Sequence, residues 1–122
     1  MSDEVELHVL KLLRDMDMSA RRIVARLDGV TRENFIDTDN LDLQDIVARR
    51  LSIIGEAAAA LHKKHAGFCE AHPEIPLRQA RGMRNILIHD YDGIDWSTVW
   101  NTAKLALPDL VKAIEPFTKK EN

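Results

Sequence analysis

The sequence lacks the features that would build a disulfide-stabilised or membrane protein. Its single cysteine, Cys69, cannot form an internal disulfide. The longest uninterrupted apolar run, at residues 57–61, is far shorter than the roughly 20 residues that cross a bilayer. The N-terminus also lacks the basic region and apolar core of a signal peptide. We therefore expect a cytoplasmic protein that does not enter a membrane.

Glycine and proline are scarce as well, with five and four residues in a chain of 122. The composition, 45% hydrophobic and 30% charged, is typical of a folded, helix-rich chain and unlike that of a disordered one. This length is close to the common size of one hydrophobic core. We expect a single domain.

Motifs for metal, nucleotide and serine-hydrolase chemistry are missing. The five histidines form no zinc pattern, because only His62 and His65 share a helical spacing and no third ligand supports them. No glycine-rich phosphate loop and no nucleophile elbow around a serine occurs. Cys69 lies close to His72 in sequence and is a weak candidate for a catalytic nucleophile. The simpler interpretation, a small buried side chain, is favoured. We predict no metal and no cofactor.

Apolar residues recur at steps of three and four, which predicts an all-α, up-and-down bundle. Four main helices are expected, at 3–27, from Asn40 or Asp42 to about 65, from Pro76 to about 89, and from the cap Asp95 onward with a kink at Pro108. A short helical turn begun by Thr31 adds a minor element. Gly55 and the alanines at 57–60 indicate close approach by another helix, from this chain or from a second copy.

Charge is spread unevenly along the chain. Residues 1–56 carry 12 acidic and 8 basic side chains, whereas residues 57–122 carry 8 and 9. A polyanion site is therefore expected in the second half, where Arg78, Arg81 and Arg84 supply local positive potential. Arg78 and Arg81 are candidate contacts for such a polyanion, for example RNA.

The stretch "RGMRNILIHDYDGID" at 81–95 concentrates polar residues that can do chemistry without a metal. Transesterification of RNA needs a base and an acid, which histidine supplies near neutral pH, and positive charge on the phosphate, which arginine supplies. Arg84 and His89 are five residues apart and would point away from each other on one straight helix. They can share a substrate only if the helix unwinds or if a second chain completes the site, as in a two-fold dimer. Residue types alone leave another interpretation open, with Arg84 in a structural ion pair and His89 at a helix C-terminus.

The segment "RNILIHDY" resembles the R-x4-H-x-Y signature of HEPN domains, specifically the HepT-like toxins that are paired with MNT-type nucleotidyltransferase antitoxins. The segments "RRLSIIGEAAAAL", "IPLRQARGMRNILIHDYDGID" and "VWNTAKLALPDLVKAIEPF" are also similar to family segments and follow in the same order. The resemblance covers most of the chain, so residues 1–122 are identified as a single HEPN, HepT-like domain.

The resemblance implies a helical homodimer and a metal-independent endoribonuclease that is the toxin of a type VII-like toxin–antitoxin system. It implies that Arg84 and His89 are catalytic, that Asn85 supports them, and that Tyr91 is the residue to which the antitoxin adds AMP. The added anion would block RNA in a basic cleft. An alternative within the same family is a non-catalytic HEPN partner or nucleotide-binding subunit of a nucleotidyltransferase.

Overall fold

The computed structural model describes residues 3–37, 39–88 and 93–119, and the regular secondary structure in these ranges is entirely helical. The helices are α1 (Asp3–Leu27), α2 (Arg32–Ile36), α3 (Leu41–Lys64), α4 (Ala66–Ala71), α5 (Leu77–Gly82), α6 (Asn85–Ile88), α7 (Trp96–Leu105) and α8 (Leu107–Thr118). The expected all-α class is confirmed. Of these helices, none combines the length with the hydrophobicity that a membrane crossing requires.

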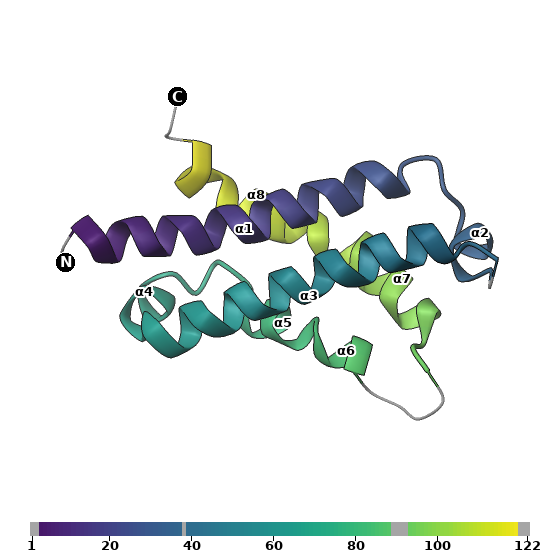
Figure 1. Ribbon diagram of the computed structural model, residues 1–122. Helices are drawn as coiled ribbons and strands as arrows, with labels where there is room; N and C mark the ends of the chain where they lie inside the picture. The colour runs from purple at the N-terminus through teal and green to yellow at the C-terminus, as the bar shows by residue number, and fades with distance from the viewer. Residues whose placement is uncertain (1–2, 38, 89–92, 120–122) are drawn as a thin grey trace.

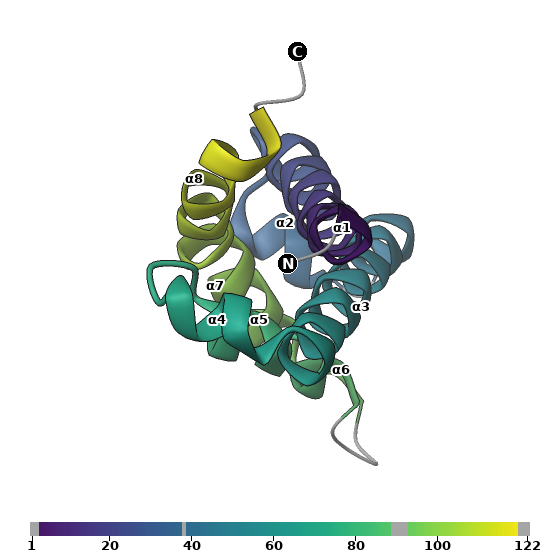
Figure 2. The ribbon, with the colours of Figure 1, turned by 90° about the vertical axis from the view of Figure 1, so that its left-hand side faces the viewer.

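The two long helices, α1 and α3, run antiparallel side by side along the length of the molecule (Figure 1). α8 packs against α1, and α5 packs against α3, while α7 continues into α8 and also contacts α2. Seen from the end of the bundle, α6 and α8 lie on opposite sides of the molecule (Figure 2). The core is enclosed between these helices.

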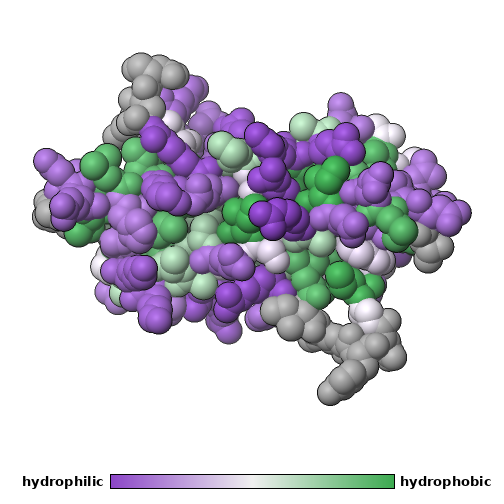
Figure 3. Space-filling view, viewed as in Figure 1, coloured by the Kyte–Doolittle hydropathy of each residue, from purple (hydrophilic) through white to green (hydrophobic). Residues whose placement is uncertain are grey.

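The core follows the apolar periodicity of the long helices. α1 buries residues at steps of three and four, including Leu13, Met16, Ala20 and Ile23, so the predicted amphipathic face is confirmed. Val24, which shares that spacing, remains 42% exposed and lies outside the core. Hydrophobic residues reach the surface between hydrophilic ones on the face that shows α1 and α3 (Figure 3).

Local capping sets several helix ends. Thr31 Oγ1 accepts a hydrogen bond from the backbone N of Asn34 (3.1 Å) and begins α2 as predicted. Asp95 Oδ1 accepts from the backbone N of Ser97 (3.0 Å) and of Thr98 (3.3 Å), which confirms Asp95 as the cap of α7. α3 begins after Asn40, but the Asn40 side chain makes no capping bond and instead donates to the carbonyl of Asn34 (3.0 Å).

Two predicted helices are each broken into two. The helix expected from Pro76 to about 89 stops at Gly82 and resumes at Asn85, with a turn at residues 83–84. The helix expected from Asp95 onward breaks at Ala106, which separates α7 from α8, and not at Pro108. The proline ring clashes with the carbonyl four residues earlier, so the break precedes it and Pro108 lies in the first turn of α8. The segment between the second and third predicted helices, where no helix was predicted, contains the short helix α4.

Candidate functional site

Arg84 lies in the turn between α5 and α6, and Asn85 is the first residue of α6. Both are exposed. The turn is held by local hydrogen bonds on each side, from the backbone N of Met83 to the carbonyl of Ala80 (3.1 Å) and from the backbone N of Leu87 to the carbonyl of Arg84 (3.1 Å). The chain therefore turns at Arg84 and presents its side chain to solvent.

The segment before this turn is anchored in the core. Leu77, Ala80 and Met83 are buried, with exposed fractions of 7%, 0% and 2%. They hold α5 against α3. Because Met83 is buried and the next residue, Arg84, is exposed, the backbone of Arg84 leaves the core at a fixed point.

Gly55 on α3 lies directly beneath the turn. A Cβ atom at position 55 would lie 2.9 Å from Cβ of Arg84 and 3.0 Å from its backbone N. The close approach expected at Gly55 is therefore made within this chain, and the residue that makes it is Arg84.

The other two arginines of the row lie on α5. Arg78 is exposed, whereas Arg81 is half-buried. Arg81 Nε is buried and has no hydrogen-bond partner in the part of the chain that the structure describes. Within those ranges, Arg78, Arg81 and Arg84 also form no ion pair, so the structural ion pair considered for Arg84 finds no acidic partner there.

His89 and Tyr91 lie outside the described residues. In sequence His89 directly follows α6, which ends at Ile88, and both residues precede the capped start of α7.

The pKa of Asp95 is lowered by the hydrogen bonds that its carboxylate accepts from the hydroxyl and the backbone amide of Thr98. The charge of Arg32 makes a smaller contribution in the same direction. Capping by Asp95 fixes the start of α7 just beyond Tyr91.

Cys69 has the environment of a structural residue. Burial raises the pKa of its thiol, and the nearby positive charge of Arg81 opposes that rise. Its Sγ lies 3.6 Å from the carbonyl oxygen of Leu61, to which it donates. A raised pKa lowers the thiolate fraction that a nucleophile needs, which favours the interpretation of Cys69 as a small packed side chain.

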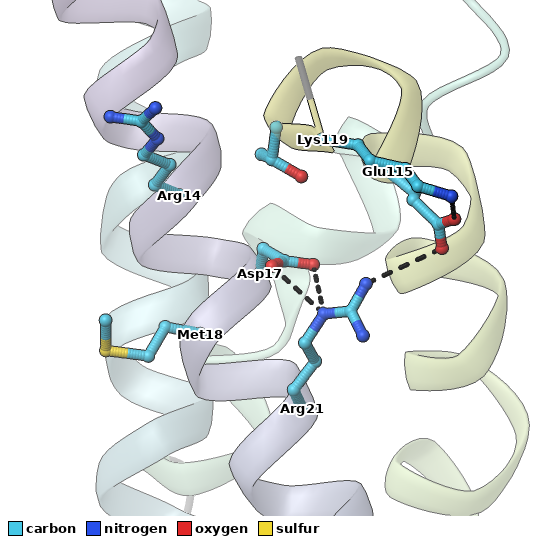
Figure 4. A pocket seen from close by; sticks show the side chains of 7 residues that line it. Arg14, Asp17, Met18, Arg21, Glu115 and Lys119 are labelled. Carbon is cyan, nitrogen blue, oxygen red and sulfur yellow. Dashed lines mark hydrogen bonds and ion pairs between the residues drawn. The ribbon is translucent and has the colours of Figure 1, made fainter. Parts of the chain in front are cut away.

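A hollow of about 450 Å³ lies between α1 and α8 and is lined by charged side chains (Figure 4). There Arg21 Nε donates to Asp17 Oδ1 (3.0 Å), and Arg21 Nη2 lies 3.6 Å from Glu115 Oε2. Lys119 Nζ lies 3.6 Å from the other oxygen of Glu115. These cations are already paired with carboxylates, and α8 lies on the opposite side of the bundle from α6 (Figure 2).

Comparison with known proteins bears on the Arg84 turn. A model of the family described as "Ribonuclease HepT-like" matches residues 16–117. The chain belongs to the HepT-like ribonuclease family. The match includes the whole stretch from Arg78 to Tyr91, and the family predicted from the resemblance of "RNILIHDY" is confirmed.

Several curated relatives agree with this membership of the HepT-like family. "Putative RNase MJ1216" of Methanocaldococcus jannaschii is 40% identical over 87 residues, 71% of this chain and 68% of the relative. "Putative RNase TTE0752" of Caldanaerobacter subterraneus is 33% identical over 99 residues, 81% of this chain and 84% of the relative. "Probable ribonuclease HepT" of Thermococcus cleftensis is 41% identical over 76 residues, 62% and 66% of the two chains. No solved structure gives a significant match.

One hydrogen bond in this HepT-like chain, between His8 and His65, joins residues that no pattern in the sequence brings together. Nδ1 of His8 on α1 and Nε2 of His65, which follows α3, lie 2.7 Å apart in a hydrogen bond across 57 positions. His62, which the sequence placed near His65, is exposed. No group of three or more metal-ligating side chains occurs in the ranges that the structure covers.

Proposed function

We propose that this chain is the toxin of a toxin–antitoxin pair, and that it is a metal-independent endoribonuclease that acts in the cytoplasm. The observation that carries the proposal is Arg84, an exposed cation that forms no ion pair within the described ranges. Its backbone is fixed on α3, and it stands five residues before His89 in a HepT-like ribonuclease sequence.

The proposed reaction is transesterification within RNA. A base takes the proton of the 2′-hydroxyl, and the 2′-oxygen forms a bond to the adjacent phosphorus. The bond from phosphorus to the 5′-oxygen breaks, and an acid protonates that oxygen. The products are a 2′,3′-cyclic phosphate and a 5′-hydroxyl. His89 is suited to the proton transfers, and the guanidinium of Arg84 to binding two phosphate oxygens as negative charge develops.

A homodimer would complete this site. One chain offers one histidine next to Arg84, whereas the reaction uses both a base and an acid. A two-fold axis near the α5–α6 turn would bring two copies of Arg84 and His89 to one cleft. Asn85, exposed beside Arg84, would then support the cleft, and Arg78 and Arg81 would contact RNA at its edge. Sedimentation as a monomer at concentrations where RNA is cut would refute the shared site.

The proposed antitoxin is an MNT-type nucleotidyltransferase that adds AMP to Tyr91. A bulky anion next to Arg84 and His89 would exclude RNA by charge and by size. Mass spectrometry of the protein co-expressed with such a partner would show a gain of AMP in the wild type. The gain should be absent in Tyr91→Phe. An unmodified Tyr91 beside an active partner would refute this part.

RNA cleavage in EDTA tests the catalytic proposal. We expect the wild type to leave 2′,3′-cyclic phosphate ends, and Arg84→Ala to lose roughly 100- to 1,000-fold in rate, the usual loss when one transition-state donor is removed. Arg84→Ala should remain folded, because the side chain is exposed and alanine keeps the Cβ that contacts α3.

His89→Ala should also lower the rate of cleavage strongly. Arg22→Ala is the matched control, since Arg22 is an exposed arginine on α1 away from the turn. If the Arg84→Ala variant cut RNA at the wild-type rate, the proposed role of Arg84 would be excluded. A wild type that leaves RNA uncut but binds a nucleotidyltransferase would favour the non-catalytic partner instead.

A further inference from the structure

α3 meets the turn that carries Arg84 at a residue without a side chain, Gly55. A Cβ atom at position 55 would lie 2.9 Å from Cβ, 3.0 Å from the backbone N and 3.4 Å from Cγ of Arg84. Non-bonded carbon atoms are most favourably placed at about 3.5 to 4.0 Å. Even a methyl group at position 55 therefore requires Arg84 to move.

The atoms that would have to move are the fixed part of Arg84. Its backbone N and Cβ follow Met83, which is 2% exposed in the core. The carbonyl of Arg84 accepts a hydrogen bond from the backbone N of Leu87 (3.1 Å). Rotation of the arginine side chain cannot relieve a clash with its backbone N and Cβ, so the turn itself must shift.

We infer that Gly55 is a positioning residue for Arg84: its lack of a side chain lets the turn and the Arg84 stem rest against α3, which sets where the guanidinium begins. This inference rests on the proposed function of Arg84. A displacement of about 1 Å at a catalytic group can lower a rate by about 100-fold. Gly55 thus affects the rate of RNA cleavage through the position of Arg84, without touching the substrate.

The sequence supports this interpretation, because glycine is unfavourable inside the 24-residue helix α3. Alanine at position 55 would be the better helix former, so a local account of stability does not explain the glycine. Gly67 in α4 is a matched control, since a Cβ at that position would meet nothing within 4 Å.

The test compares Gly55→Ala with Gly67→Ala in the full chain. We expect Gly55→Ala to lower kcat for RNA cleavage by roughly 10- to 100-fold, with KM changed by less than about twofold. Gly67→Ala should cleave as the wild type does. Far-UV circular dichroism should show the same helix content in all three proteins. A Gly55→Ala variant with wild-type kcat overturns the inference, and so does a rate loss that only follows a loss of folded protein.

A second measurement does not need activity. Arg84→Gly removes the two carbon atoms that approach position 55, so Gly55→Ala should cost less thermal stability in the Arg84→Gly background than in the wild type. Equal changes in the thermal midpoint in both backgrounds overturn the inference. If the wild type cuts no RNA, the proposed function fails, whereas this coupling still decides whether Gly55 holds Arg84 in place.

Discussion

Gln44 offers a sharp test of how the end of the bundle around α2 is held together. It is a buried polar side chain, 2% exposed, near the start of α3. Its Nε2 donates to the carbonyl of Phe35 (2.9 Å) and to the carbonyl of Asp37 (3.2 Å). These two bonds tie the end of α2 to α3. Phe35 in turn contacts the rings of Trp96 and Trp100 on α7.

Gln44→Met removes both donors but keeps the length and the helix propensity of the side chain. Each lost hydrogen bond costs about 1 kcal/mol, and an unsatisfied buried carbonyl adds about 1 to 3 kcal/mol. The apolar methionine offsets part of this loss. We therefore expect the free energy of unfolding to fall by about 2 to 3 kcal/mol.

Urea denaturation followed by circular dichroism measures this change, with the slope of the transition unchanged. Gln79→Met is the matched control because Gln79 is exposed on α5. It should change stability by no more than about 0.5 kcal/mol. Equal effects of the two substitutions would refute the role of Gln44.

Three further predictions concern the cap Asp95, the thiol of Cys69 and the hydrogen bond between His8 and His65. Hydrogen bonds from Thr98 hold the pKa of Asp95 below its ordinary 3.8, so its stabilising effect is full above that pH and is lost as the pH falls below it. Asp95→Asn should flatten the acid side of a plot of thermal midpoint against pH, and an unchanged slope would contradict this. Cys69, whose pKa burial raises, should react with iodoacetamide several-fold more slowly in the folded protein than in urea; equal rates would show an accessible thiolate. His8→Ala should cost about 1 kcal/mol through the lost bond to His65, whereas His62→Ala, at an exposed position, should cost nothing measurable by thermal denaturation.

Much of the helical structure could be predicted because its causes are local. The 25 residues of α1 match the predicted range 3–27, since apolar spacing continues without interruption until the turn at Gly29, whose φ of +80° favours glycine. Thr31 and Asp95 were recognisable as caps because a cap depends only on the side chain and the next three residues.

The break at residues 83–84 could not be predicted from periodicity. Leu77, Ala80 and Met83 keep a helical spacing, and nothing in the following residues forbids a helix. The turn lies where Arg84 meets α3 at Gly55, and that contact joins segments that are distant in sequence. Likewise Pro108 indicated an interruption, but the packed chain breaks two residues earlier.

The sequence by itself determined the helical class, the caps Thr31 and Asp95, and the motif that contains both Arg84 and His89 in a HepT-like chain, because these depend on residue type and short-range spacing. The tertiary structure decided which surfaces meet. It brought Arg84 onto Gly55, Gln44 onto the end of α2, and His8 onto His65. Such contacts depend on how every helix packs against the common core, so no local pattern in the sequence specifies them.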